Sequence, residues 1–373
     1  MRNDLHGIIY TLSSEPALRE LVERRNSASI PFGGRYRLVD FALSMMVNAG
    51  IRDVGVIMER NYQSLLDHLS NGADWGLARR TGGLRLLPPF GLREDHSGSF
   101  NGCMEALRSV SSYINDISHE DIVLCAADWV GNIDLEKAVD LHRSTGAEIT
   151  AVCSQGWHPG PHHRLVPDED GFARKLLFSE GGPGEGVFSR EIYIIKRDLL
   201  LKFMDFCADA NHNHFHRDAM AHYLAQGGKI AIYEHNDYAR TFISVRDYFE
   251  ASMDLTQQPQ VMAELFPMDE RPIRTKERAE ASTYYGDGAR VRSSQVADGC
   301  YIEGELDHCI LFRGVKVEKG AKLRNCVVMQ DTVIKAGANL NCVIADKDCV
   351  VTEDCFLSGS DRLPLVIPKG ETV

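Results

Sequence analysis

Apolar residues follow two alternating spacings in the first 255 residues. Short, continuously apolar runs of the kind that form buried strands occur at residues 7–10, 53–58 and 122–128. Between them, residues 38–49 and 62–69 carry apolar positions at helical spacing, and each stretch ends near a glycine. Strands that alternate with helices predict a mostly parallel sheet covered by helices. Ligands of such sheets bind at the carboxyl ends of the strands.

The C-terminal part of the chain follows a different period. Apolar positions recur there at steps of six residues, with two steps of five, at Leu311, Val317, Leu323, Val328, Ile334, Leu340, Ala345, Val351 and Leu357. This period is the signature of a parallel β-helix, in which each face of a coil takes one repeat. We expect the cysteines of this region to point inward as small core residues, because their spacings match no common metal site. They are Cys300, Cys309, Cys326, Cys342, Cys349 and Cys355.

The two periods define the domain organisation. We predict an α/β domain over residues 1–255, a linker over residues 256–284 and a β-helix over residues 285–373. The linker is expected because prolines and glutamines follow the helix predicted around residues 248–255.

Composition and charge narrow the functional classes. The chain has 373 residues, of which 44% are hydrophobic and 25% charged, as in an ordinary globular protein. Its net charge of -12 argues against nucleic acid as a partner, because such binding depends on lysine and arginine at the phosphates. No run approaches the ~20 apolar residues of a membrane span, and the N-terminus lacks a secretory signal. We therefore expect a cytoplasmic protein with reduced cysteines and no membrane partner.

The most specific string covers residues 30–41 and reads IPFGGRYRLVDF. One interpretation is a loop that leads into a helix, with solvated arginines. The other is a ligand loop, in which Gly33 and Gly34 let the backbone approach a substrate while Arg35 and Arg37 lie near a phosphate. The string alone leaves both interpretations open.

This string resembles the PFGGKYRIIDF segment of bacterial glucose-1-phosphate adenylyltransferases, also called ADP-glucose pyrophosphorylases. The resemblance continues at residues 248–255 (YFEASMDL), 311–315 (LFRGV) and 329–334 (MQDTVI), so it extends over nearly the whole chain. It implies the family's fold, a Rossmann-like nucleotidyltransferase domain of the GT-A type followed by a left-handed parallel β-helix. The family makes ADP-glucose and pyrophosphate from ATP and glucose 1-phosphate, for glycogen.

The phosphate-binding motifs of this family are changed here. The family has a GGxGxRL loop after its first strand, whereas residues 8–32 of this chain contain no glycine. Side chains would block backbone N–H groups from the phosphates, and Glu15 would repel them. The lysine before the family's PFGG string is absent, and residues 177–181 (LFSEG) lack the lysine of its FVEKP motif.

The resemblance also implies that only part of the family's magnesium site is retained. Asp128 matches the aspartate of the GDH motif, but the aspartate of the WRDVGT segment falls on Thr241 here. A neutral hydroxyl cannot replace a carboxylate as a charge-neutralising Mg²⁺ ligand, so we expect no metal, no cofactor and no catalytic residue in this chain alone. In the segment that matches GTADA, Gly102 is retained while Glu105 adds negative charge.

A histidine cluster coincides with the family's HDFGKD segment. Residues 213–218 read NHFHRD, and histidines stand at position 212, just before this segment, and at positions 214 and 216 within it. We interpret the cluster as a solvated loop, because a zinc site would need a further ligand that the sequence does not identify.

Loss of these groups with retention of the scaffold is what a regulatory subunit would show. The resemblance thus implies a subunit, inactive or nearly so on its own, that modulates a catalytic ADP-glucose pyrophosphorylase in a heterotetramer, with Mg²⁺ bound in the catalytic partner. The remnants of the pocket, which a sugar phosphate or nucleotide could still occupy, are Gly33, Gly34, Arg35, Asp40, Gly102 and Asp128.

Three alternatives remain open at this point. The first is an active adenylyltransferase that uses Asp128, Arg35 and Arg37 in place of the missing groups. The second is a stand-alone sensor that binds a sugar phosphate or nucleotide without turnover. The third is acyl transfer on the β-helix, for which His308 is the one suitable histidine of the repeats.

Overall fold

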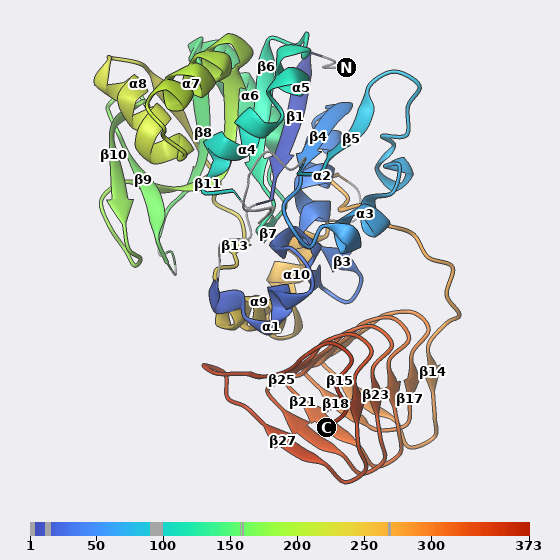
Figure 1. Cartoon of the computed structure of the whole chain (residues 1–373). Coiled ribbons are helices and arrows are strands. Elements are labelled where there is room, and N and C mark those ends of the chain that lie inside the picture. Colours follow the sequence, from blue (N-terminus) through green and yellow to red (C-terminus); the bar gives the residue numbers. More distant parts are fainter. Residues whose placement is uncertain (1–3, 12–15, 90–99, 157, 159, 268–269) are drawn as a thin grey trace.

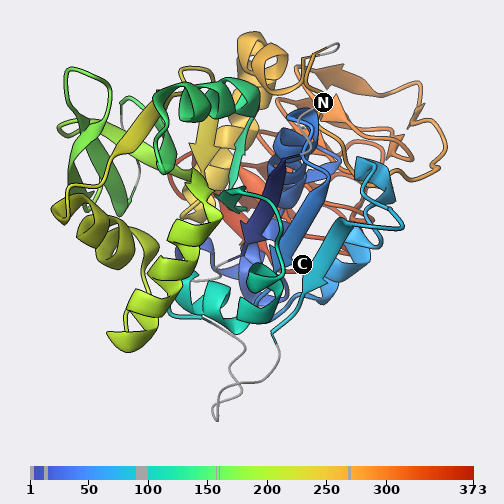
Figure 2. The same cartoon turned by 90° about the horizontal axis from the view of Figure 1, so that it is seen from above.

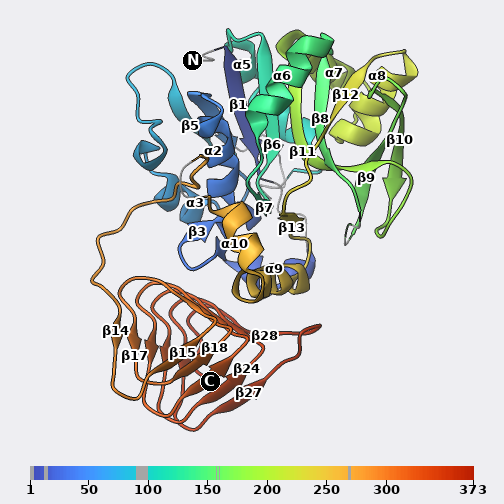
Figure 3. The ribbon, with the colours of Figure 1, turned by 180° about the vertical axis from the view of Figure 1, so that it is seen from behind.

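The computed structural model describes residues 4–11, 16–89, 100–156, 158, 160–267 and 270–373. It has two parts, an α/β domain and a β-helix, which lie one above the other in Figure 1. Helices α9 (Val245–Gln257) and α10 (Pro259–Leu265) stand between the central sheet and the β-helix in Figures 1 and 3. Residues 12–15, which include Glu15 and belong to the stretch that replaces the family's glycine loop, lie outside the described residues.

A nine-stranded sheet forms the centre of the α/β domain. Its strands run in the order β10-β9-β11-β6-β1-β4-β5, and β8 pairs with both β11 and β12. Strands β1, β4, β5 and β6 are parallel, whereas β11 is antiparallel to β6. The mostly parallel sheet that the apolar runs predict is therefore confirmed.

The strands of this domain are β1 (Leu5–Tyr10), β2 (Pro31–Phe32), β3 (Tyr36–Arg37), β4 (Asp53–Ile57), β5 (Gly83–Leu87), β6 (Asp121–Ala126), β7 (Trp129–Gly131), β8 (Ile149–Ser154), β9 (His162–Pro167), β10 (Ala173–Ser179), β11 (Val187–Lys196), β12 (Ile230–Glu234) and β13 (Ala239–Thr241). The other helices are α1 (Glu20–Glu23), α2 (Leu38–Asn48), α3 (Gln63–Leu69), α4 (Cys103–Ser109), α5 (Ser111–Asn115), α6 (Leu135–Thr145), α7 (Arg197–Asp209), α8 (Ala221–Ala225) and a π-helical turn at Phe215–Met220.

Helices cover both faces of the sheet, as the alternation of strand side chains requires. In β1, Leu5 and Ile9 belong to the apolar cluster that contains α2 and α6, whereas Ile8 and Tyr10 belong to the cluster that contains α4, α5 and α7. Figure 2 shows these two groups of helices on opposite sides of the sheet. Among the described residues, no helix combines the length and apolar character that crossing a membrane would require.

The C-terminal part consists of three parallel five-stranded sheets and forms a left-handed β-helix. The six-residue period explains this arrangement, because Leu311, Val317 and Leu323 lie on three different sheets. The next step returns the chain to the first sheet at Val328, which pairs with Leu311. The predicted apolar positions are buried, except that Leu357 is only partly buried.

The cysteines of the β-helix point inward as expected, and all are buried except the partly buried Cys355. The strands of the β-helix are β14 (Tyr284–Tyr285), β15 (Arg290–Arg292), β16 (Gln295–Val296), β17 (Tyr301–Ile302), β18 (Glu305–Asp307), β19 (Ile310–Leu311), β20 (Lys316–Val317), β21 (Lys322–Arg324), β22 (Val327–Val328), β23 (Val333–Ile334), β24 (Asn339–Asn341), β25 (Val343–Ala345), β26 (Val350–Val351), β27 (Phe356–Ser358) and β28 (Leu365–Ile367).

The predicted linker at residues 256–284 begins inside the α/β domain. Helix α10 lies in this range and packs against α9 and β7. The side-chain amide of Asn132 donates to the carbonyl oxygens of Leu265 and Arg271, at 3.0 and 2.9 Å. Pro259 starts a helix here, since proline is well tolerated in a first helical turn.

One apolar core runs through the contact between the two parts. Its members include Leu38 and Phe41 of α2 together with Ile310 and Phe312 of the β-helix. A buried ion pair lies at the same contact, where one guanidinium nitrogen of Arg25 is 2.7 Å from both carboxylate oxygens of Asp346. The two parts are therefore joined by a packed interface.

Candidate functional site

A cavity of about 320 Å³ lies at the carboxyl ends of β1 and β6. Tyr10, the last residue of β1, and Ala126, the last residue of β6, both line it. Residues of β9, β10, β11, β13, α4 and the π-helical turn also line it. This is the edge of a parallel sheet at which ligands are expected, so the position agrees with the prediction from the sequence.

The structure places Asp128 and Thr241 together at this cavity. Strand β13 pairs with β7, and the N–H of Phe242 donates to the carbonyl oxygen of Asp128 at 2.9 Å. Both Asp128 and Thr241 line the cavity. Thr241 is paired with Trp129, the residue that follows Asp128, so the position next to this pair on β13 carries a hydroxyl and not a carboxylate. These residues do not fit Mg²⁺, which is bound by carboxylates that offset its charge.

Gly102 also lines the cavity, and close packing explains why this residue is a glycine. A Cβ atom at this position would lie 2.2 Å from the carbonyl oxygen of Asn213. That oxygen accepts a hydrogen bond from the N–H of Met104, at 3.0 Å. Gly102 therefore lets the start of α4 approach the segment before the π-helical turn.

Gly33 and Gly34 do not line the cavity. They form the turn between β2 and β3, with φ angles of 57° and 80°, which favour glycine. Gly34 faces the β-helix, where the carbonyl oxygen of Leu311 would lie 3.6 Å from an added Cβ atom. Gly34 therefore lies at the contact with the β-helix, whereas Gly33 packs next to Tyr36, Leu255 and Phe266.

Arg35 and Asp40 also lie outside the cavity wall. The side chain of Arg35 is exposed. Asp40 is fully buried in α2, where Oδ1 lies 2.6 Å from Nε2 of His68 and Oδ2 accepts from the N–H of Arg37 at 2.9 Å. The guanidinium of Arg37 donates to the carbonyl oxygen of Ser64 at 2.5 Å. Of the two interpretations of this string, the structure favours a turn that leads into a helix.

The charge of the cavity does not suit phosphates. Among the described residues that line it, none is a lysine or an arginine. Two are carboxylates, Asp128 and Glu191, and five are histidines: His158, His162, His163, His214 and His216. Transfer between two phosphate-bearing substrates requires groups that offset negative charge.

Three side chains from separate elements converge inside the cavity. His163 comes from β9, His216 from the π-helical turn and Glu191 from β11. The pairing of β11 with β8 is irregular between Ser189 and Ile192, and Glu191 has a φ of 57°. This irregularity aims the carboxylate of Glu191 at the two imidazoles. Strain of this kind, about 1–3 kcal/mol, is often found at functional sites.

The contacts among these side chains are short. Oε1 of Glu191 lies 3.4 Å from Nε2 of His216 and 3.8 Å from Nδ1 of His163. Its Oε2 accepts a hydrogen bond from the hydroxyl of Tyr10 at 2.8 Å. The hydroxyl of Tyr193 lies 2.5 Å from Nε2 of His216. The imidazole rings of His163 and His216 are stacked, with centroids 4.0 Å apart.

Burial controls the charge of this cluster. Burial lowers the pKa of His216 to about 3, although Glu191 acts in the opposite direction, so this imidazole is neutral at pH 7. Burial alone would raise the pKa of Glu191, but the adjacent imidazoles and the Tyr10 hydroxyl outweigh it and lower that pKa, which keeps the carboxylate ionised. Burial and the charge of Glu191 raise the pKa of Tyr10, so its hydroxyl remains a donor.

The interpretation of the histidine cluster as a solvated loop is wrong for His216. This side chain is 5% exposed, and His214 is partly buried and lines the cavity. The side chain of His212 is 43% exposed. His163 and Glu191 are not predictable from the sequence together with His216, because residues on separate strands and turns have no fixed spacing. The histidine-rich segment 158–163 was the one available signal.

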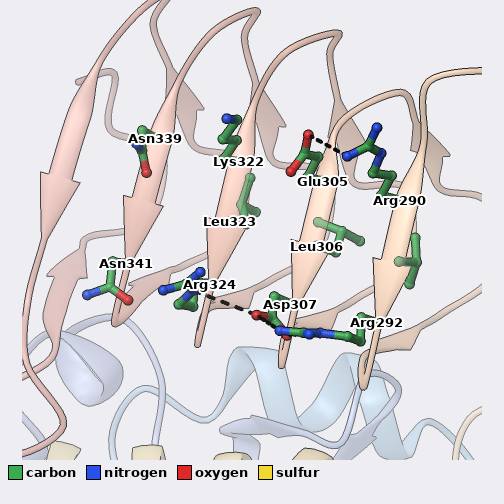
Figure 4. A pocket seen from close by; sticks show the side chains of 11 residues that line it. Arg290, Arg292, Glu305, Leu306, Asp307, Lys322, Leu323, Arg324, Asn339 and Asn341 are labelled. Carbon is green, nitrogen blue, oxygen red and sulfur yellow. Dashed lines mark hydrogen bonds and ion pairs between the residues drawn. The ribbon is translucent and has the colours of Figure 1, made fainter.

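A larger open depression of about 670 Å³ runs along the outer face of the sheet β15-β18-β21-β24-β27, as Figure 4 shows. Its charged side chains pair across successive coils. Arg292 lies 2.6 Å from Asp307, and Arg324 lies 3.7 Å from the same carboxylate. Arg290 lies 3.9 Å from Glu305. Cross-strand pairing accounts for these charges except that of Lys322, and the depression is open, so the smaller cavity is the better candidate site.

Two family models match the chain. The model described as nucleotidyl transferase matches residues 17–163, and the model described as GlmU-like, C-terminal hexapeptide matches residues 281–362. The first match covers β6 and Asp128 at the cavity, and the second covers most of the β-helix. The predicted combination of domains is thereby confirmed.

Relatives match over almost the full length. The chain is 32% identical over 370 residues to the glycogen biosynthesis protein GlgD of Bacillus subtilis (strain 168), which covers 99% of this chain and 96% of that protein. It is 27% identical to the glucose-1-phosphate adenylyltransferase of Clostridium perfringens (strain 13 / Type A), over 91% of this chain and 87% of the relative. The same enzyme of Clostridium beijerinckii is also 27% identical, over 99% of this chain and 96% of the relative. The chain therefore belongs to the family that contains GlgD and the glucose-1-phosphate adenylyltransferases.

Proposed function

We propose that this chain is a regulatory subunit, without substantial adenylyltransferase activity of its own, that assembles with a catalytic glucose-1-phosphate adenylyltransferase in glycogen synthesis. The cavity at the ends of β1 and β6 carries this proposal. It holds Asp128 beside Thr241, and its described lining contains no lysine or arginine. The similarity to GlgD, named a glycogen biosynthesis protein, supports the pathway.

The chemistry of adenylyl transfer explains why this cavity is unsuited to catalysis. The reaction brings a nucleoside triphosphate and a sugar phosphate together, so a metal and cations must offset several negative charges. Asp128 supplies one carboxylate. Glu191 supplies a second, but this carboxylate contacts the hydroxyl of Tyr10 and the imidazoles of His216 and His163. We place the Mg²⁺ of the reaction in the catalytic partner.

Regulation would act through contacts between subunits. A coupling free energy of about 1–3 kcal/mol between a partner interface and the catalytic site changes activity by roughly one to two orders of magnitude. The outer coils of the β-helix offer aromatic surface for such contacts, because Tyr284 and Tyr301 stack 4.8 Å apart and are 52% and 39% exposed. Aromatic residues are enriched at protein interfaces. A heterotetramer is the assembly that we expect.

The test is release of pyrophosphate from ATP and glucose 1-phosphate with Mg²⁺. It compares this chain alone, the catalytic subunit of the same organism alone, and the two co-expressed and purified together. We expect no turnover by this chain alone, and higher activity for the complex than for the catalytic subunit. Size-exclusion chromatography with light scattering gives the composition of the complex.

One variant separates the effect of the missing metal ligand from the effect of the missing cationic side chains that would bind phosphates. Thr241→Asp restores a second carboxylate beside Asp128 but adds no cation. We expect this variant to remain inactive alone, since the cavity still lacks lysine and arginine among its described lining residues. Turnover by the unmodified chain at the rate of the catalytic subunit would refute the proposal.

A further inference from the structure

The cluster of His163, Glu191 and His216 has a donor set that the proposed function does not use. It supplies two imidazole nitrogens and one carboxylate oxygen, and these atoms all lie within 4.8 Å of one another. His163, Glu191 and His216 all line the cavity. Their donor atoms therefore face a space large enough for an ion and water. Two imidazoles with one carboxylate form a common ligand set for zinc and related ions.

We propose that His163, Glu191 and His216 bind a divalent transition-metal ion of the Zn²⁺ class. This inference goes beyond the regulatory function, because it concerns the isolated chain and requires no partner subunit. The ligands are Nδ1 of His163, Oε1 of Glu191 and Nε2 of His216. A tetrahedral ion takes a fourth ligand, water, from the cavity.

The distances fit this coordination. Metal–ligand bonds of ~2.0–2.2 Å place neighbouring donors of a tetrahedral ion roughly 3.3 Å apart. Oε1 of Glu191 already lies 3.4 Å from Nε2 of His216 and 3.8 Å from Nδ1 of His163. Nδ1 of His163 is buried and makes no hydrogen bond. Rotation of the partly exposed His163 side chain brings this nitrogen to the ion.

The groups around the ligands can support the bound ion. The Tyr10 hydroxyl donates to Oε2 of Glu191, which leaves Oε1 for the metal. The Tyr193 hydroxyl contacts Nε2 of His216, and the ion would displace this contact. Tyr193 also contacts Oγ of Ser189, so its hydroxyl retains a partner. Hydrogen bonds to ligating groups orient them and strengthen metal binding.

The same ligands disfavour magnesium. Mg²⁺ prefers oxygen ligands in octahedral geometry, whereas imidazole nitrogen favours zinc, cobalt and related ions. The site also differs in place from the family-type position at Asp128, although both face one cavity. Binding of Zn²⁺ or Co²⁺ without Mg²⁺ is therefore the expected selectivity.

The experiment uses the full chain, purified, treated with EDTA and desalted. Co²⁺ is added and the visible absorption of the ion is recorded, because tetrahedral Co²⁺ absorbs far more strongly than octahedral Co²⁺. Zn²⁺ affinity is then measured by competition with a chromophoric chelator, and metal content by mass spectrometry. We expect one tightly bound ion per chain and the strong absorption of tetrahedral Co²⁺.

Variants identify the ligands. His163→Ala, Glu191→Gln and His216→Ala should each weaken Zn²⁺ binding by about 100-fold or more, since even outer-shell changes cost 10–100-fold. His222→Gln is the control: this histidine stacks on Phe206, at 4.2 Å between centroids, and should leave binding unchanged. Because His216 is buried, circular dichroism checks folding. His163→Ala, at a partly exposed side chain, remains decisive if the His216 variant unfolds.

The metal-binding experiment has one outcome that supports the site and one that overturns it. Stoichiometric binding that is lost in His163→Ala and Glu191→Gln but kept in His222→Gln supports the site. Absence of micromolar Co²⁺ or Zn²⁺ binding, or binding that survives in the His163→Ala and Glu191→Gln variants, overturns it. Neither result depends on adenylyltransferase activity, so the regulatory proposal is tested separately.

Discussion

Lys347 is an unusual single residue, because its ammonium group is largely buried at the contact between the domains. Burial, together with the nearby Arg37 and Arg25, lowers its pKa from 10.5 to about 7, and the adjacent Asp346 only partly opposes this shift. Below pH 7 the group is charged in both the folded and the unfolded chain, so the folded state bears the full cost of burying the charge. Between pH 7 and 10.5 the unfolded chain binds more protons, and the stability of the protein rises with pH.

Lys347→Met should therefore stabilise the protein at pH 6, with a smaller gain at pH 9.5. The expected increase in melting temperature is about 2–4 °C for each 1 kcal/mol of penalty removed. Thermal unfolding followed by circular dichroism at both pH values measures it. The exposed Lys322 gives the control Lys322→Met, for which little change at either pH is expected. An equal gain from Lys347→Met at both pH values would contradict the lowered pKa.

Single residues were predicted well where a string of sequence defines them, and poorly where a fold assembles them. The motifs place Asp128 and Thr241 at one site, and both line the cavity, because Asp128 directly precedes β7 and Thr241 ends β13, the strand that pairs with β7. The string at residues 30–41 and its resemblance to the family assigned Gly33 and Gly34 to a pocket, but their positive φ angles form the turn between β2 and β3, where Gly34 faces the β-helix. Glu191 could not be predicted, since only the irregularity of β11 aims it at the histidines.

Among whole elements, the β-helix was the most predictable. Each coil repeats one packing requirement, so the six-residue period appears directly in the sequence. Helix α10 was missed, because a proline in its first turn and a length of 7 residues imitate a linker. The π-helical turn at Phe215–Met220 was missed as well, since its charged and histidine residues give no helical period.

The tight stacking of coils leads to a prediction for Gly304. A Cβ atom there would lie 2.5 Å from the backbone oxygen of Ala321 in the next coil and 2.8 Å from Val317. Gly304→Ala should destabilise the protein by about 1–3 kcal/mol, the usual effect of overpacking. Gly288→Ala is the matched control, because its nearest neighbour would lie 3.5 Å away, and it should be neutral or slightly stabilising.

Chemical denaturation of both glycine variants measures this difference. We expect the unfolding midpoint to fall to a lower denaturant concentration for Gly304→Ala and to stay the same or rise slightly for Gly288→Ala. If the two variants unfold at the same denaturant concentration, the coils tolerate an added methyl group and are not tightly packed at Gly304.

At the scale of the molecule, the ion pair of Arg25 and Asp346 fastens the two parts together. Their side chains are 4% and 2% exposed, so removal of one partner leaves an uncompensated buried charge. Arg25→Met should destabilise the folded chain by about 3–5 kcal/mol. The double variant Arg25→Met with Asp346→Leu should recover much of this loss, since an apolar pair can replace a buried ion pair.

Urea unfolding compares these variants with a surface pair. Arg174 and Glu185 are both 55% exposed, and Arg174→Met should cost no more than about 1 kcal/mol. If Arg25→Met is as mild as Arg174→Met, the ion pair does not hold the domains together. In that case the double variant has no lost free energy of unfolding to recover.

The apolar core shared by α2 and the β-helix affects how the two domains can evolve. A chain cut in the segment before β14 would expose Ile310, Phe312 and Val327 on one fragment and Leu38 and Phe41 on the other. Contiguous apolar surface of this kind promotes association with unrelated proteins. Exchange of either half with that of a distant relative would join surfaces that have not changed together. The two domains should therefore be inherited together and change together, even though each has the fold of an independent domain.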